Sequence, residues 1–189
     1  MLIPVLLVTG IFFSVTSKAQ ENKNIDYKLQ IKLVSKDSAF NLQALKLQTS
    51  FTSKSLCTNY ISGIITLLSS KGYPTASVDS IIENENSTLI HLFLGHQYYW
   101  INLQTDSVEK AALTYSRFQN KDYNGKLLNI PQLNNLQQKI LTYYTNNGYP
   151  FAQVYLDSIK LNEEKMEAKL KVNKGQVYYI DSIQIIGKG

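Results

Sequence analysis

Residues 141–154 read LTYYTNNGYPFAQV, and residues 65–78 read ITLLSSKGYPTASV. Each stretch holds an apolar run, two polar residues and Gly-Tyr-Pro, and then, after one variable residue, Ala-x-Val. The offset from Gly72 to Gly148 is 76 residues, and the other matching positions keep it. A repeat of this size means that one structural unit occurs twice, so it decides the architecture before any single residue is interpreted.

The repeated motif predicts a helix, a sharp stop and a strand. Glycine after an apolar-periodic run adopts the left-handed conformation that ends a helix, and a proline two residues later prevents the helix from resuming. Ala-x-Val then begins the alternation of a half-buried strand. We assign a structural turn role to the six motif residues, which are Gly72, Tyr73, Pro74, Gly148, Tyr149 and Pro150.

The segments around the two motifs predict the same order of elements in each half. In the first half we expect a strand at 27–34, a helical piece at 41–48, a helix at 55–70 and strands at 75–82 and 88–94. In the second half we expect a strand at 99–103, helices at 108–118 and 131–146, and strands at 151–161 and 168–172. The sequence therefore predicts an α+β protein of two tandem β-α-α-β-β units. Each unit has a three-stranded mixed sheet packed on two helices.

The second unit has extra residues between its last two strands. The shared Asp-Ser-Ile at 79–81 and 157–159 is displaced by two residues relative to the motif offset, so part of the insertion falls within the earlier of these strands. A β-bulge accommodates such extra residues.

The ends of the chain differ from the two units. Residues 1–19 are an apolar run that ends in small residues, as in a signal peptide, although no Lys or Arg precedes the run. The alternative is an N-terminal strand of a cytosolic core. We expect a linker at 20–26, units at 27–97 and 98–178, and at 179–189 the start of a truncated third unit.

Composition and motifs argue against several classes of function. The net charge of +5 is spread without a Lys/Arg cluster, which argues against a nucleic-acid partner. Cys57, the single cysteine, matches an apolar helix position of the second copy. His91 and His96 lack further metal ligands nearby, and no nucleotide-binding or nucleophile motif is present. We expect no cofactor, no metal and no enzymatic activity.

The pattern resembles tandem POTRA (polypeptide-transport-associated) domains, which precede the outer-membrane β-barrel in assembly factors of the BamA/TamA type. The element order carries this resemblance, together with NGYPFAQV at 147–154 and the junction GQVYYIDSI at 175–183. Gly187, which follows that junction, also fits the pattern. The resemblance covers residues 27–189 and is closer in the second unit, because no glycine follows WINL at 100–103 in the position of Gly187.

The resemblance implies an exported module on the periplasmic face of the outer membrane. It would bind unfolded outer-membrane proteins or assembly-complex subunits, and its C-terminal β-barrel would lie outside this chain. In such domains the first strand lies beside the third, so the second strand is an edge that accepts an extended client as a further strand. The edge residues singled out here are Ala76, Val78, Phe151, Gln153, Val154 and Tyr155.

The 13 tyrosines keep a second interpretation open. Tyr98, Tyr99 and Trp100 are adjacent, and such side chains stack on sugars in exported carbohydrate- or peptide-binding modules. Neighbouring strand residues point to opposite faces, so at most two of the three share a surface. Packing at a domain junction explains them more simply. A POTRA-type domain of a cell-division or secretion protein is a further alternative, which retention of residues 1–19 as a membrane anchor would favour.

Overall fold

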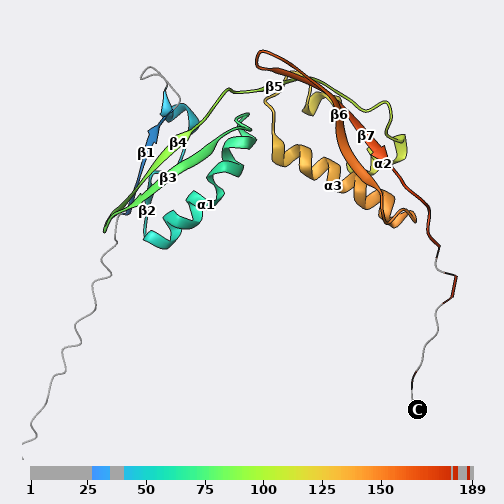
Figure 1. Cartoon of the computed structure of the whole chain (residues 1–189), viewed down its shortest axis with the longest axis horizontal. Helices are drawn as coiled ribbons and strands as arrows, with labels where there is room; N and C mark the ends of the chain where they lie inside the picture. Colours follow the sequence, from blue (N-terminus) through green and yellow to red (C-terminus); the bar gives the residue numbers. More distant parts are fainter. Residues whose placement is uncertain (1–26, 35–40, 180, 183–186, 188–189) are drawn as a thin grey trace, which may run out of the picture.

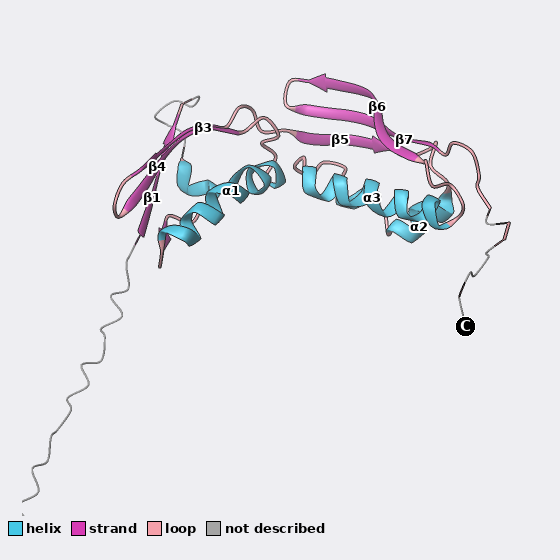
Figure 2. Ribbon diagram, turned by 60° about the horizontal axis from the view of Figure 1, so that its bottom comes forward, coloured by secondary structure: helices cyan, strands magenta, loops and turns pink. Residues whose placement is uncertain are grey.

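The chain folds as two α+β units that follow one another along the sequence (Figure 1). The computed structural model describes residues 27–34, 41–179, 181–182 and 187. The predicted signal peptide and linker lie outside these residues, as does most of the predicted third unit, whose described residues belong to no strand. In both units the helices cover one face of the sheet, and Figure 2 shows these covered faces on the same side of the molecule.

The first unit has a four-stranded sheet. Its strand order is β2-β1-β4-β3, with β1 parallel to β4 and the other pairs antiparallel. Its elements are β1 (Tyr27–Leu33), the 3-10 helix η1 (Leu42–Leu45), β2 (Ser50–Phe51), α1 (Lys54–Ser70), β3 (Ser77–Glu83) and β4 (Ser87–Phe93).

The second unit has a three-stranded mixed sheet of order β5-β7-β6, in which β5 is parallel to β7. Its elements are β5 (Tyr99–Gln104), α2 (Lys110–Ser116), the 3-10 helix η2 (Asn120–Asp122), α3 (Ile130–Asn146), β6 (Gln153–Asn162) and β7 (Lys165–Asn173). The predicted β-α-α-β-β order is therefore confirmed, with the short η2 added.

The first unit departs from the prediction at 41–48. The expected helical piece is only the single turn η1, which ends where Lys46 adopts a left-handed φ of 50°. The chain then extends into β2, because Phe51 is buried against the core and its ring lies 5.3 Å from that of Tyr60. Pairing of β2 with the start of β1 makes the sheet four-stranded, where three strands were predicted.

Side chains cap both long helices at their N-termini. The Ser53 hydroxyl accepts a hydrogen bond from the Leu56 N–H at 3.3 Å, and the Asn129 side chain accepts one from the Gln132 N–H at 2.9 Å. Pro131 lies in the first turn of α3, where its missing N–H costs nothing. These caps fix where α1 and α3 begin.

Each unit buries its own core between the sheet and its long helix. The cores correspond along the repeat, since Ile64 and Leu68 of α1 match Ile140 and Tyr144 of α3, and all four are buried. Cys57 is fully buried among the residues of the first core, as expected. Helices α1 and α3 also contact each other, so the two units touch.

Candidate functional site

In each unit, the strand that follows the Gly-Tyr-Pro motif is an edge strand, as predicted. Among the strands that the structure describes, β3 pairs only with β4, and β6 pairs only with β7. Along β3 only Val78 is half-buried, and the other residues are exposed. An edge strand presents a row of unpaired N–H and C=O groups that an extended chain can complete. The capacity of these edges to bind a client stays a prediction.

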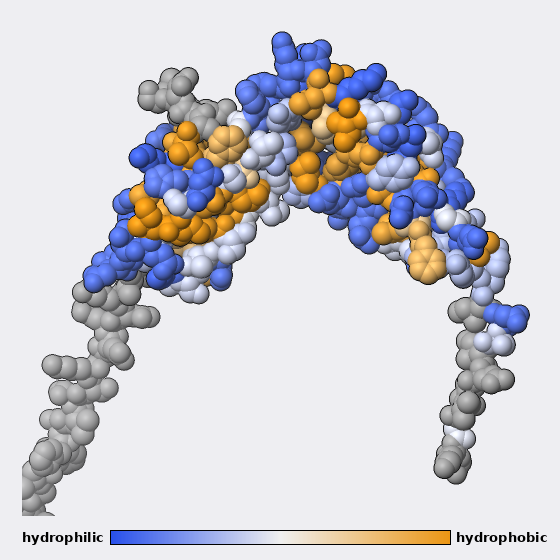
Figure 3. Space-filling view, in the orientation of Figure 1, coloured by the Kyte–Doolittle hydropathy of each residue, from blue (hydrophilic) through white to orange (hydrophobic). Residues whose placement is uncertain are grey.

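A groove runs between β3 and α1. Its volume is about 430 Å³, and its walls are largely apolar. Figure 3 shows hydrophobic side chains gathered over this part of the first unit. The lining residues are Thr58, Ile61, Ser62 and Ile65 from α1, and Ala76, Ser77, Val78, Ile81 and Glu83 from β3 and the turn before it.

A β-bulge decides which side chains of β3 face the groove. Val78 pairs with Leu92 and Ser80 pairs with His91, so Asp79 is an extra residue. Beyond the bulge Ile81 pairs with Ile90, which is buried on the same face as Leu92. The bulge therefore turns Ile81 toward α1, although 52% of its side chain stays exposed.

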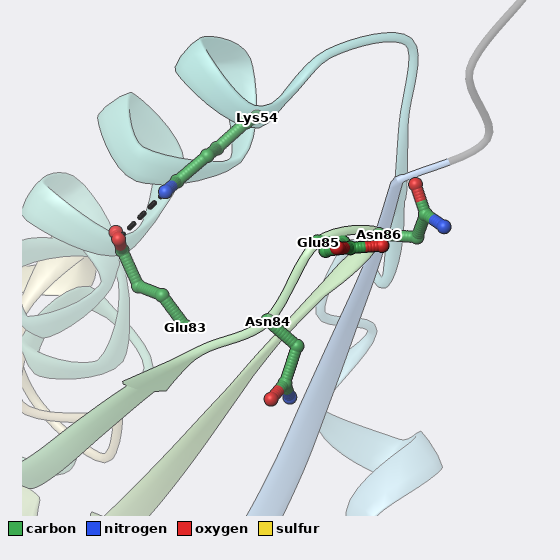
Figure 4. A pocket seen from close by; sticks show the side chains of 5 residues that line it. All are labelled: Lys54, Glu83, Asn84, Glu85 and Asn86. Atoms are coloured by element: carbon green, nitrogen blue, oxygen red, sulfur yellow. Dashed lines mark hydrogen bonds and ion pairs between the residues drawn. The ribbon is translucent and has the colours of Figure 1, made fainter.

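An ion pair holds one end of the groove. The Lys54 Nζ lies 2.7 Å from Glu83 Oε2, which joins the first turn of α1 to the last residue of β3 (Figure 4). This hydrogen bond raises the pKa of the Lys54 ammonium. Glu83 also lines an open polar pocket of about 700 Å³ at the β3–β4 turn, together with Asn84, Glu85 and Asn86.

The edge of the second unit has a different surrounding. The Gln137 side chain on α3 donates a hydrogen bond from Nε2 to the backbone carbonyl of Val154, at 3.3 Å. A bulge follows between Asp157 and Lys160, in which Ser158 has a φ of 52° and donates its N–H to Asp157 Oδ1 at 2.8 Å. A hydrogen bond from Lys171 lowers the pKa of the Asp157 carboxyl. A bulge is therefore present in β6, but it does not accommodate the insertion as predicted: β3 has a corresponding bulge at Asp79, and the two inserted residues, Tyr155 and Leu156, pair regularly with β7.

The predicted edge residues fall into three environments. Val78 and Val154 are half-buried within their strands, and Gln153 and Tyr155 are exposed on β6. Ala76 is buried in the turn before β3. Phe151 also precedes its strand, with 68% of its surface exposed and its ring 5.3 Å from that of Tyr178. Gln137 was not among the predicted residues, although alignment of the two copies places this polar residue at the position of Ile61.

The two Gly-Tyr-Pro motifs form the predicted turns. Gly72 has a φ of 90° and Gly148 a φ of 88°. The Tyr73 N–H donates to the Leu68 carbonyl at 3.1 Å, and the Tyr149 N–H donates to the Tyr144 carbonyl at 3.0 Å. Together with the bonds from the glycine N–H groups, these complete a Schellman motif at the end of each helix.

Each of these glycines also anchors the segment that leaves its own unit. The Gly72 carbonyl accepts the Tyr98 N–H at 2.7 Å, and the Gly148 carbonyl accepts the Tyr178 N–H at 2.8 Å. A Cβ at Gly72 would lie 3.0 Å from the Tyr98 carbonyl oxygen. The sequence patterns do not predict this joint, because it is a contact between backbone groups.

Of the three adjacent aromatic residues at the junction, only Tyr99 is exposed. Trp100 is buried in the core of the second unit, where its ring contacts that of Tyr123. Tyr98 is half-buried, and 37% of Tyr99 is exposed. These residues pack the junction, so they give no support to a carbohydrate-binding module.

The histidines have local partners. His91 Nδ1 lies 2.6 Å from the Ser80 hydroxyl, and His96 Nδ1 lies 3.9 Å from Glu164. Within the described part of the chain, no three His, Cys, Asp or Glu side chains gather as a metal site would require. The described helices also include none with the length and apolarity needed to span a membrane.

Comparison with known protein families finds a match to part of the second unit. Residues 109–175 match the family model of the POTRA domain, ShlB-type. No curated protein sequence matches the chain.

Among solved structures, the chain is similar to the POTRA3-5 region of BamA from Haemophilus influenzae, with a TM-score of 0.52 and 13% identity over 80% of this chain and 67% of that one. It is also similar to POTRA1-2 of the periplasmic domain of Omp85 from Anabaena, with a TM-score of 0.44 and 13% identity over 82% of this chain and 97% of that one. A Haemophilus ducreyi BamA lacking POTRA domains 1-3 gives a TM-score of 0.47 and 14% identity over 77% of this chain and 29% of that one.

Proposed function

We propose that the chain is a pair of tandem POTRA domains, the second of which contains the residues 109–175 that match the family model, and that it binds unfolded polypeptide by adding an extended segment to the edge of a sheet. The clients would be outer-membrane β-barrel proteins or subunits of an assembly or translocation complex. We further propose that the module works in the periplasm, ahead of a β-barrel. The observation that carries the proposal is β3, an edge strand with exposed residues beside an apolar groove.

Backbone pairing supplies the first part of the binding. A client strand completes the hydrogen bonds of the edge without needing any particular side chain, which suits a module that accepts many sequences. Val78 corresponds to Val154 in the repeat, and each pairs with the last strand of its own unit at a matching position. Because the Val154 carbonyl bonds to Gln137 on α3, we infer that both valines direct their backbone groups away from the sheet.

The groove supplies the second part. Side chains on one face of an added strand would point toward α1 and enter the groove beside Ile81. Burying apolar surface there contributes about 25 cal/mol per Å². Specificity would therefore come from alternate client residues, while the backbone accepts any sequence.

Two matched substitutions test this arrangement. Ile81 faces the groove, whereas Ile82 pairs with Leu89 on the opposite face, and their exposures are similar at 52% and 47%. We expect Ile81→Asp to weaken binding of a fluorescent peptide from an outer-membrane β-strand by about tenfold or more, because a charge would be desolvated in the groove. Ile82→Asp should bind nearly as the unaltered chain does. Equal effects of the two substitutions would contradict binding at this edge.

A further inference from the structure

The edge strands β3 and β6 occupy equivalent positions in the two units, but their backbone groups differ in the hydrogen bonds that they form with side chains. On β6, the Val154 carbonyl accepts a hydrogen bond from the Gln137 side chain, and the Ser158 N–H is bonded to the Asp157 carboxylate. Over the described part of the chain, no side chain hydrogen-bonds to the backbone of β3. The β6 edge is thus partly satisfied from within its own unit, and the β3 edge is open.

One substitution within the repeat accounts for much of this difference. The 76-residue offset places Ile61 of α1 at the position of Gln137 of α3. An isoleucine side chain has no donor, so it leaves the carbonyl of the facing strand available. Ile61 instead forms part of the apolar groove wall opposite Val78. The same helix position therefore closes one edge and lines a binding groove at the other.

The charges beside the two edges differ as well. Residues 77–87, which include β3 and its turn, contain Asp79, Glu83 and Glu85 and no Lys or Arg; Glu83 is paired with Lys54 of α1, which leaves Asp79 and Glu85 as the acidic groups of this edge. Residues 153–165, which include β6 and its turn, mix acidic side chains with Lys160 and Lys165. Although the whole chain has a net charge of +5, the β3 edge is acidic, and charge complementarity favours a basic client there.

We propose that β3 is the client-binding edge of this chain and that it takes an extended, unfolded segment in which apolar residues alternate with lysine or arginine. Apolar client side chains enter the groove beside Ile81, and basic ones lie near Asp79 and Glu85. Gln137 keeps the β6 edge closed to the same client. This inference rests on the proposed function and adds which edge acts and which client chemistry it selects.

Titration calorimetry with two short synthetic peptides tests the selection. One peptide alternates valine with lysine, and the other alternates valine with glutamate. The unaltered chain should bind one molecule of the valine-lysine peptide. The affinity should fall as salt is added, because salt screens exposed charges. The valine-glutamate peptide should bind at least about tenfold more weakly, since its charges repel those of the edge. Equal affinity for both peptides would overturn the charge selection.

Matched variants then locate the edge. Ile159 is the β6 counterpart of Ile81 in the shared Asp-Ser-Ile, and 56% of it is exposed. Ile81→Asp should abolish binding, Ile159→Asp should leave it unchanged, and Gln137→Ile should add a second binding event on β6.

Three results would overturn the assignment while strand addition itself survives. The first is that the unaltered chain binds two peptides with equal affinity. The second is that Ile159→Asp, and not Ile81→Asp, loses binding. The third is that Gln137→Ile shows no second binding event. If the unaltered chain binds neither these peptides nor the outer-membrane strand peptide, the proposed function fails as well.

Discussion

Replacing Gly148 by alanine tests the physical basis of the repeated turn. Gly148 has a φ of 88°, and the left-handed region costs a residue with a Cβ about 1–2 kcal/mol. The added Cβ would also lie 3.2 Å from both the Tyr178 carbonyl oxygen and the Val177 Cγ2, so the exit segment must shift. We therefore expect the second unit to lose about 1–2 kcal/mol from the backbone cost alone, with the contact adding to it.

The measurement is a calorimetric melting curve. For a domain of this size each kcal/mol lowers the melting temperature by about 4–8 °C, so the transition of the second unit should fall by about 5–15 °C. Gly63 is the control, because it lies exposed inside α1 and a Cβ added there would meet nothing within 4 Å. Gly63→Ala should stabilise the first unit by about 0.5–1 kcal/mol, since glycine is unfavourable within a helix. An unchanged or higher transition in Gly148→Ala would refute the reasoning.

Ile64→Ala and Ile140→Ala remove equivalent, fully buried side chains, so each should destabilise its own unit by about 2–5 kcal/mol. In calorimetry, each substitution should lower the transition of its own unit more than that of the other unit. Equal shifts of both transitions would contradict separate cores. Burial raises the pKa of Tyr123 to about 12, which means that the unfolded chain ionises first as the pH rises. The free energy of unfolding should therefore fall as the pH rises from about 10 to 12, and it should fall less steeply in Tyr123→Phe. If absorbance shows that Tyr123 of the folded chain forms tyrosinate near pH 10, the raised pKa is wrong. Cys57 should react with a thiol reagent only at the rate of unfolding, whereas rapid labelling of the native chain would show that its burial is wrong.

The repeat made most of the fold predictable. Gly72 and Gly148 marked the ends of two helices, and the strands around them followed from alternation, which gave the correct order of elements in the second unit and, apart from 41–51, in the first. The resemblance to POTRA domains added that the first strand lies beside the third, which no local pattern in the sequence indicates. Local chemistry and the family pattern together therefore sufficed for the architecture.

The missed features depend on contacts between distant segments. β2 has only two residues, and it exists because Phe51 is buried when it pairs with β1. The bond from Gln137 to the Val154 carbonyl and the bond from Tyr98 to the Gly72 carbonyl both join groups far apart in the chain. A periodicity reports which face of an element is apolar, and it carries no information on such individual bonds.

Hydrogen exchange of the backbone amides tests the central claim most directly. The exchange rate of each backbone amide would be measured with and without the valine-lysine peptide. The account predicts that the peptide slows exchange along Ser77–Glu83, with Val78 among the protected amides, and leaves Gln153–Asn162 unchanged. Peptide binding without added protection on β3 would contradict the account, because strand addition must cover the amides of the strand that it extends.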